Sequence, residues 1–330
     1  MIQTSITNSP QNVTLDEAKK PVGFSSLAAL PSNLGAIEAG MRFANGTTPF
    51  VVVLGSSGWG KTHLLNSVCT FMRLQGCEVN DPVSATSYTD GVDGIEESSP
   101  LLLDDVQDAL RNMRTKQRFR RMLERRMSAR RPTLLAFSDT VTLKQVAQFL
   151  PGAREWGMQK ISEPTHSERE LIVRQIADVE GVSLSHPIVS LVSRQLFGNG
   201  RSIQGALQTM RLVKTDWSRR EDVCAACGVL TPYLHGIEGW DVRDAAMDAV
   251  ERAFIKRTPS DFDKEQMCAY LLIVEIGLSE QTVATFLGES PSKVYGMSTA
   301  VKLAREDATV QACIDLCKDE FARAIDGGIH

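Results

Sequence analysis

The chain has 330 residues, of which 42% are hydrophobic and 23% charged, the balance of a globular protein rather than a disordered or fibrous one. It contains no run of about 18 apolar residues, and its N-terminus lacks the basic and apolar segments of a signal peptide, so we expect no membrane span and a cytoplasmic location. The seven cysteines do not suggest a disulfide scaffold in so long a chain. Cys224 and Cys227 lack a second ligand pair, so buried helical thiols are expected there rather than a metal site.

Charge is distributed unevenly, although the net charge is only −4. Residues 111–131 contain ten Arg or Lys and one acid, whereas residues 241–330 contain sixteen acids and ten bases. A dense basic segment indicates an anionic partner such as nucleic acid. The alternative is a solvated helix face above a core of Phe119, Met122 and Leu123. Because like charges at i,i+4 are destabilising, we favour a phosphate-binding surface. Its expected DNA-binding residues are Arg118, Arg121 and Arg125.

The first elements in chain order predict a parallel sheet. Residues 1–20 have low hydrophobicity and no period, which predicts a disordered tail. Apolar runs at 50–54, 100–103 and 133–137 predict buried strands, and a further strand is expected near 78–86. Helical patterns at 62–73 and 104–131 alternate with these strands, as in α/β proteins.

From about Glu163 the pattern becomes helical. Residues 167–180 place Leu171, Ile172, Ile176 and Val179 on one helix face, residues 202–213 are similar, and 238–330 predict about five helices. These patterns predict an α/β domain at 21–162 and helical regions at 163–238 and 239–330. A phosphate-loop motif makes the first an α/β P-loop domain, and a family resemblance implies that 163–238 is an all-helical lid and 239–330 an all-α domain.

A phosphate-binding loop is predicted between the first strand and its helix. Residues 55–62 fit the pattern G-x-x-x-x-G-K-[ST], whose glycines let backbone N–H groups surround phosphates at a helix N-terminus. Lys61 is expected to reach the β and γ oxygens of ATP, and the Thr62 hydroxyl to bind Mg²⁺. The residues expected to bind ATP or ADP are Gly55, Ser56, Ser57, Gly58, Trp59, Gly60, Lys61, Thr62 and His63.

A pair of carboxylates ends the second strand. Asp104 is expected to hold the metal with Thr62, and Asp105 to orient the attacking water, because phosphoryl transfer depends on positioning and charge. An exposed acidic turn after a buried strand is the alternative. With the phosphate loop, the pair predicts an ATPase that is slow and switch-like.

Several motifs together resemble the DnaA family of bacterial replication initiators, which are AAA+ ATPases. Residues 58–65 are similar to its P-loop, residues 101–107 to its second nucleotide motif, and residues 200–207 to its sensor 2, in which Arg201 contacts the γ-phosphate. Ser138 and Asp139 fall on its sensor 1 pair, and the resemblance covers about 22–310. It implies an AAA+ fold, oligomerisation with itself or a related initiator, and DNA binding in replication initiation or its control. The catalytic residues it implies are Lys61, Asp105, Ser138, Asp139, Arg154 and Arg201.

A helix-turn-helix is predicted at 279–305. Ala284, Gly288 and Val294 have the required spacing, and Ser290-Pro291 would cap the second helix. Ser292 and Lys293 are the early exposed positions expected to bind DNA. A simple packing unit is the alternative.

The chain departs from the family at four places. No N-terminal helicase-recruiting domain is expected in 1–20, and residues 63–100 are too short for the helix that initiators insert to grip single-stranded DNA. The family's Arg-Asp-His-Thr signature falls on Glu289-Ser290-Pro291-Ser292, which disfavours its usual DNA box. The arginine that acts in trans aligns with Ala153, one residue before Arg154.

Three functions are compatible with these observations. The first is a DnaA-like ATPase that oligomerises on DNA. The second is an ATP-regulated adaptor that docks on a true initiator or helicase and binds little DNA itself. The third is a nucleotide-dependent transcription regulator that uses only the helix-turn-helix. Binding to duplex and single-stranded DNA separates the first and third from the second.

Overall fold

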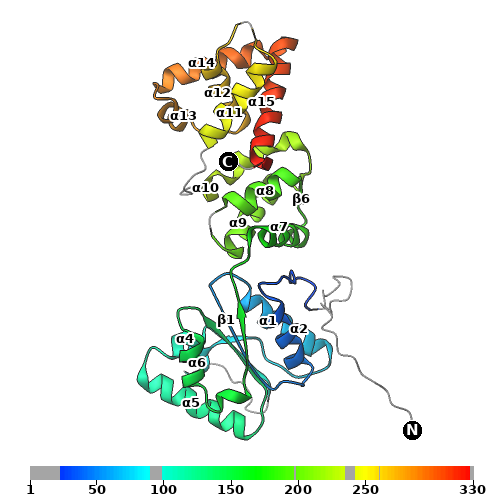
Figure 1. Ribbon diagram of the computed structural model, residues 1–330, viewed down its shortest axis with the longest axis vertical. Helices are drawn as coiled ribbons and strands as arrows, with labels where there is room; N and C mark the ends of the chain where they lie inside the picture. Colours follow the sequence, from blue (N-terminus) through cyan, green and yellow to red (C-terminus); the bar gives the residue numbers. More distant parts are fainter. Residues whose placement is uncertain (1–22, 90–98, 197, 235–241, 260, 328–330) are drawn as a thin grey trace, which may run out of the picture. The chain divides into compact units, whose positions relative to one another are not determined.

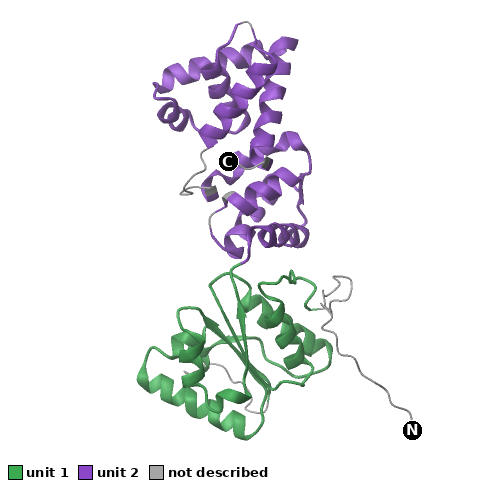
Figure 2. Cartoon of the chain, in the orientation of Figure 1, with its two compact units in different colours: residues 1–163 green, residues 164–330 purple. Residues whose placement is uncertain are grey.

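A computed structural model describes residues 23–89, 99–196, 198–234, 242–259 and 261–327. These residues form two compact units, which divide between Glu163 and Pro164 (Figure 2). The predicted tail at 1–20 and most of the acidic stretch at 89–99 lie outside the described residues.

The first unit has an α/β architecture. Its elements in chain order are α1 (Leu34–Ala44), β1 (Phe50–Gly55), α2 (Lys61–Leu74), β2 (Val83–Ser84), α3 (Ala85–Thr89), β3 (Leu101–Asp104), α4 (Val106–Ala109), α5 (Met113–Ser128), β4 (Thr133–Ser138), α6 (Leu143–Phe149), η2 (Ala153–Glu155) and β5 (Gly157–Ile161).

The strands form one parallel sheet in the order β2-β3-β4-β1-β5. Successive side chains of a strand point to opposite faces, and β1 shows this alternation. Val51 and Val53 enter a core with α1 and α2, whereas Phe50, Val52 and Leu54 enter a second core with α4, α5 and α6. Figure 1 shows these two helix layers on opposite faces of the sheet. The continuous apolar runs in the sequence therefore reflect burial on both faces.

The order of the strands determines where a ligand can bind. β1 lies between β4 and β5, so the chain leaves β1 towards one side of the sheet and returns later on the other. In open α/β sheets, ligands bind beyond the carboxyl ends of the strands at such a reversal point. The loop that follows β1 is the predicted phosphate loop.

Three predictions for the first unit need correction. The single helix expected at 104–131 is two helices, α4 and α5, because the Asn112 side chain caps α5 by accepting a hydrogen bond from the N–H of Arg114 at 2.9 Å. The strand expected at 78–86 is only two residues long, and helix α3 follows it. Strand β5 was not predicted, because Gly157–Ile161 is not a continuous apolar run. Only Ile161 among these residues is buried.

The second unit is mainly helical. Its elements are α7 (His166–Glu180), β6 (Ser183–Leu184), α8 (His186–Gln195), α9 (Gly200–Val213), β7 (Asp216–Trp217), η3 (Arg220–Asp222), α10 (Val223–Leu234), α11 (Val242–Lys256), α12 (Lys264–Tyr270), the π-helical η4 (Leu271–Glu275), α13 (Glu280–Leu287), α14 (Pro291–Leu303), η5 (Ala304–Glu306) and α15 (Ala308–Gly327).

Two details of this unit differ from the prediction. The segment expected to be an all-helical lid contains a short parallel pair, in which Ser183 and Leu184 of β6 lie opposite Asp216 and Trp217 of β7. The buried face of α7 also differs in part: Val173 and Ala177 are buried, and the predicted Ile172 and Ile176 pack partly buried against the core. Leu171 and Val179 are instead 52% and 60% exposed. Both features depend on tertiary partners that a helical period does not specify.

One continuous hydrophobic core joins the helices of the second unit, and it includes Cys224 and Cys227 of α10. Within this unit, Gly228 of α10 lies against the end of η4. A Cβ atom at position 228 would lie 1.7 Å from the carbonyl oxygen of Ile276. Only glycine fits this backbone contact.

Helices α13 and α14 are joined by a short turn. Gly288 ends α13 in the left-handed conformation, with φ 70°, and the Ser290 side chain caps α14 by accepting a hydrogen bond from the N–H of Lys293. Ala284 and Val294 are buried where the two helices pack. Across the described ranges, no helix is both long enough and apolar enough to cross a membrane.

Candidate nucleotide site

The loop between β1 and α2 has the backbone of a phosphate cradle. Gly58 and Gly60 have positive φ values of 79° and 94°, which favour glycine. Gly55 is required for a different reason, because a Cβ there would lie 2.8 Å from the carbonyl oxygen of Ile161 in β5. Gly60 precedes α2, whose first N–H groups have no partner within the helix and can bind an anion.

Lys61 lies within this loop. Its side chain is 6% exposed, and its Nζ donates hydrogen bonds to the carbonyl oxygens of Gly55 at 2.7 Å and Ser56 at 2.9 Å. The ammonium group is therefore held against the inner side of the loop. Ser57 is exposed, and Trp59 is partly buried against the core that contains α1 and α2.

Thr62 and Asp104 come together although they are far apart in the sequence. The Thr62 hydroxyl donates a hydrogen bond to Oδ2 of Asp104 at 2.5 Å. Mg²⁺ takes oxygen ligands in octahedral geometry and is commonly held by one or two protein groups and substrate phosphates. A hydroxyl and a carboxylate beside a phosphate cradle fit that ion, and no other metal is suggested by groups of His, Cys, Asp and Glu in the described part of the chain.

Asp105 follows Asp104 in an uncommon conformation. Its φ of 49° and ψ of 42° are left-handed, and its backbone N–H donates to Oδ1 of Asp104 at 2.9 Å. Asp tolerates this conformation better than most residues. The Asp105 side chain is exposed, and its Oδ1 accepts a hydrogen bond from Nε2 of Gln107 at 3.1 Å.

Gln107 also bonds to the neighbouring strand. Its Oε1 accepts a hydrogen bond from the N–H of Ser138, at the end of β4, at 2.8 Å. The sequence predicts no role for Gln107, although it closes the 101–107 motif. Its position two residues after Asp105 is the signal that could have indicated one.

The sensor 1 pair lies beside the phosphate loop. Asp139 follows β4, and its Oδ2 accepts a hydrogen bond from the Ser56 hydroxyl at 2.7 Å. Gly55 and Ser138 are opposite each other in the parallel register of β1 and β4. The structure thus brings together the predicted residues Lys61, Thr62, Asp104, Asp105, Ser138 and Asp139.

The segment before α1 packs against α2. The His63 ring lies with Nε2 2.7 Å from the Ser26 hydroxyl, and desolvation lowers the pKa of His63 although the residue retains solvent contact. Phe24 is fully buried and packs edge-on against Phe71 of α2, with ring centroids 5.7 Å apart. Ser26 and Phe24 therefore fix this segment to α2.

The two predicted arginines lie in different units. Arg154 is exposed in η2, whereas the adjacent Ala153 packs against the core of the first unit. Arg201 is exposed in the first turn of α9 in the second unit, where the Asn199 side chain accepts a hydrogen bond from its N–H at 3.0 Å.

Helix α9, which bears Arg201, is held by one carboxylate. Glu180 ends α7, and its side chain is 9% exposed. Its Oε1 accepts hydrogen bonds from Gln204 and Gln208 at 3.0 Å each, and its Oε2 lies 3.1 Å from the guanidinium of Arg211. These contacts lower the pKa of Glu180, the two glutamine hydrogen bonds most of all.

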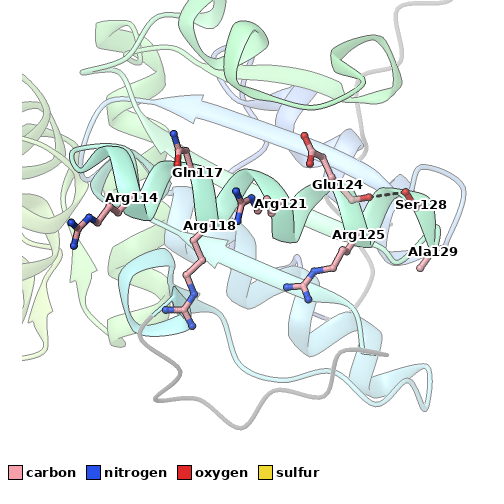
Figure 3. Close-up of a pocket in the computed structure, with 8 residues that line it drawn as sticks. All are labelled: Arg114, Gln117, Arg118, Arg121, Glu124, Arg125, Ser128 and Ala129. Carbon is pink, nitrogen blue, oxygen red and sulfur yellow. Dashed lines mark hydrogen bonds between the residues drawn. The ribbon is translucent and has the colours of Figure 1, made fainter.

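The basic segment presents an arginine face on α5. The exposed side chains of Arg114, Arg118, Arg121 and Arg125 follow one stripe of the helix, since residues three and four apart share a face. Figure 3 shows Arg118 and Arg125 extending to the same side, away from Gln117 and Glu124. Arg114 is an addition to the predicted set, and its spacing from Arg118 indicates it.

One arginine of α5 faces inwards instead. Arg126 is 3% exposed, and its guanidinium donates to the hydroxyl of Thr133 and to the carbonyl oxygens of Ser99 and Pro132. This side chain anchors α5 to the start of β4 and to the segment before β3, so it is structural.

The early positions of α14 have a different electrostatic environment. Ser292 and Lys293 are exposed, but Nζ of Lys293 lies 2.6 Å from the Glu289 carboxylate. The Glu289 hydrogen bond raises the pKa of Lys293, and Glu265 and Asp263 act in the same direction. Acidic groups therefore surround the cation that the sequence predicts for this surface.

The chain is similar to bacterial replication initiators. No protein-family model matches the chain. The chromosomal replication initiator DnaA of Campylobacter fetus is 25% identical over 170 residues, which are 47% of this chain and 39% of that protein. DnaA of Dechloromonas aromatica is 25% identical over 249 residues, which are 69% of this chain and 52% of that protein. The matched region therefore spans about half the length of these relatives or less.

A solved structure shares the fold. Domain III of the Thermotoga maritima replication initiation protein DnaA superposes with a TM-score of 0.53 at 18% identity, covering 64% of this chain and 97% of that domain. The parallel sheet and its flanking helices thus have the AAA+ P-loop fold of that domain.

Proposed function

The chain is a divergent DnaA-like protein, and we propose that it is an AAA+ ATPase that oligomerises and binds DNA in replication initiation or its control. The main support is the arrangement of Lys61, Thr62 and Asp104 around a loop with two left-handed glycines. This arrangement brings a cation, a hydroxyl and a carboxylate to the carboxyl end of β1, where nucleotide phosphates bind in P-loop proteins.

We assign the nucleotide contacts to the phosphate loop. The N–H groups of residues 56–62 would surround the phosphates, and Lys61 would exchange its carbonyl contacts for the β and γ oxygens. Thr62 and Asp104 would hold Mg²⁺, which neutralises charge on the β- and γ-phosphates when bound. His63 and Ser26 would lie on the side of the nucleoside.

Hydrolysis would then depend on groups next to the γ-phosphate. Asp105 would orient the attacking water, and Ser138 and Asp139 would sense the γ-phosphate from β4. Arg201 would contact that phosphate and distinguish ATP from ADP. We assign the arginine supplied to a neighbouring subunit to Arg154, because Arg154 is exposed whereas Ala153 packs against the core.

The arginine face of α5 supports DNA binding by the first unit. Phosphate neutralisation dominates nonspecific affinity, and this face offers four exposed arginines on one stripe. Helices α13 and α14 would form the helix-turn-helix domain, with Ser292 and Lys293 as secondary contacts.

One observation favours a second function, that of an ATP-regulated adaptor for an initiator or helicase. Lys293 is paired with Glu289 and lies near Glu265 and Asp263. Phosphates would be repelled by these acids, so α14 is poorly suited to reading DNA. If the first unit also fails to bind DNA, the adaptor function is the one that agrees with the observations.

Titration calorimetry with ATP and ADP tests the nucleotide site. Lys61→Ala should lose at least about tenfold in affinity, because a hydrogen bond to a charged group contributes about 1.5–3 kcal/mol. Lys144→Ala, which removes an exposed lysine from α6, is the matched control and should bind normally. Unchanged affinity in a folded Lys61→Ala protein would overturn the proposal.

Mobility-shift assays then separate the two functions. Wild-type protein should shift duplex or single-stranded DNA, with a difference between ATP and ADP. No shift with either nucleotide, together with stimulation of ATP hydrolysis by a partner initiator, would favour the adaptor.

A further inference from the structure

Gln107 connects two parts of the candidate site through both ends of its amide. Its Nε2 donates to Oδ1 of Asp105 at 3.1 Å, and its Oε1 accepts from the N–H of Ser138 at 2.8 Å. We propose that Gln107 is a positioning residue that sets the Asp105 carboxylate for the attacking water. This inference rests on the proposed ATP hydrolysis.

The geometry of the sheet explains the bond to Ser138. β4 is longer than β3: their last paired residues are Leu103 and Leu135, whereas β4 continues to Ser138. Beyond Leu135, the strand pairing of β4 with β3 has therefore ended, and a backbone N–H on that side needs another acceptor. The Gln107 side chain supplies this acceptor at the carboxyl end of β4.

This anchor limits the motion of Asp105. The Asp105 side chain is exposed, and an exposed carboxylate samples several rotamers. A hydrogen bond from Gln107, which is itself fixed to β4, selects one of them. Because Oδ1 is held in this way, Oδ2 is the oxygen we assign to accept a hydrogen bond from water.

Hydrogen bonds connect most of the groups around the phosphate loop. They run from Thr62 through Asp104, Asp105 and Gln107 to the N–H of Ser138, and the next residue along the chain, Asp139, accepts a hydrogen bond from Ser56 of the loop. Gln107 is the link between the carboxylate pair after β3 and the sensor pair after β4. A change at the sensor pair would therefore reach Asp105 through Gln107.

In the reaction, the water oxygen forms a bond to the γ-phosphorus while the bond to the β–γ bridging oxygen breaks. ADP leaves with that electron pair, and the proton lost by the water is carried by the released phosphate. Asp105 orients the water without being consumed. Since a misplacement of about 1 Å can reduce a rate by about 100-fold, an unanchored Asp105 should slow hydrolysis strongly.

Gln107→Glu separates positioning from structural support. The introduced carboxylate keeps an oxygen for the Ser138 N–H but loses the donor to Asp105 and adds a like charge. We expect single-turnover ATP hydrolysis by the full chain to fall by about 10- to 100-fold, with nucleotide affinity changed less than about threefold. Gln148→Glu makes the same substitution at an exposed site on α6 and should leave the rate unchanged.

The pH profile provides the distinguishing readout. In the Gln107→Glu variant, the nearby Asp105 charge should raise the pKa of the introduced carboxyl group, so a proton taken up at mildly acidic pH restores the donor. The rate of this variant should therefore recover as the pH falls, relative to wild type. Gln107→Leu, which has no proton to regain, should remain slow at every pH.

The outcomes also separate this inference from the proposed function. If wild type does not hydrolyse ATP, or if Asp105→Asn hydrolyses it at the wild-type rate, the proposed role of Asp105 is wrong. If Asp105→Asn is slow while Gln107→Glu keeps the wild-type rate, Asp105 acts without Gln107 and the inference is overturned. Equal slowing of Gln107→Glu and Gln107→Leu at all pH values would also overturn it.

Discussion

The arginine face should dominate DNA affinity, and the sharpest test is to neutralise it. The triple substitution of Arg118, Arg121 and Arg125 by glutamine removes three exposed cations from one stripe of α5. The buried core of this helix, with Phe119 and Leu123, is untouched. We expect a large loss of affinity for duplex and single-stranded DNA, without loss of ATP binding.

The magnitude follows from counterion release. Each neutralised phosphate contributes about 0.9 to the salt slope on duplex DNA and about 0.7 on a single strand. Three lost contacts should therefore reduce the slope by about 2.7 or about 2.1. When the salt concentration rises from about 50 to about 200 mM, these three contacts alone weaken duplex binding by roughly 40-fold. The affinity of the mutant should therefore fall roughly 40-fold less than that of the wild type over this range.

The comparison variant removes Lys293 and Lys302 of α14. Lys293 is already paired with Glu289 at 2.6 Å, so its release would uncover a carboxylate and contribute less than a full phosphate contact. We expect this variant to lose much less affinity and to change the salt slope by less than about 2.

Fluorescence anisotropy with labelled duplex and single-stranded DNA, at several salt concentrations and with ATP or ADP, gives both slopes. Normal binding by the arginine variant, together with weak binding by the lysine variant, would refute this reasoning. The second unit would then bind the DNA, and its helix-turn-helix geometry would be a better predictor of DNA binding than the charge of α5.

Three further outcomes are expected. Arg201→Ala should reduce the ratio of ATP to ADP affinity more than it reduces ADP affinity; in calorimetry, equal loss for both nucleotides would argue against contact with the γ-phosphate. Gly228→Ala should lower the free energy of unfolding of the second unit by about 1–3 kcal/mol or more, because its Cβ would lie 1.7 Å from the Ile276 oxygen. Gly296→Ala, whose Cβ meets nothing within 4 Å, should stabilise by about 0.5–1 kcal/mol, and similar unfolding curves for the two variants would contradict the packing argument. The lowered pKa of Glu180 contributes stability that is present above its usual pKa of 4.5 and is lost as the pH falls through the lowered pKa of the folded state. The stability of Glu180→Gln should therefore fall less than that of the wild type over this acidic range. Superimposable plots of stability against pH for the two proteins would exclude this contribution.

The strand, loop and helix on the phosphate side of the candidate site could be predicted from the sequence because their determinants are local. Strand β1, the glycines and Lys61 are contiguous, and both faces of the strand are apolar. Thr62 and Asp104 were also expected at one end of the sheet, since the carboxyl ends of parallel strands lie along the same edge. The AAA+ fold of the first unit, expected from the resemblance to DnaA, is confirmed by the shared fold of domain III.

Other features depended on contacts between distant residues. The hydrogen bond from Ser138 to Gln107 is possible only because β4 is longer than β3. The buried face of α7 was predicted correctly only in part, because Leu171 and Ile172 are equally apolar and only tertiary packing distinguishes them. The break between α4 and α5 was a missed local signal, since Asn112 is a favourable cap.

The arginine face has an evolutionary consequence. Arg114 with Arg118, and Arg121 with Arg125, are like charges one helical turn apart, and each such pair opposes helix formation by about 0.2–0.5 kcal/mol. Selection for thermostability alone would replace these side chains, as it commonly removes functional residues that lower stability. A library randomised at these four positions and screened for heat resistance should therefore accumulate neutral and acidic residues. On the proposed DNA-binding role, these arginines are a trade-off in which ligand binding is gained at the expense of folding stability.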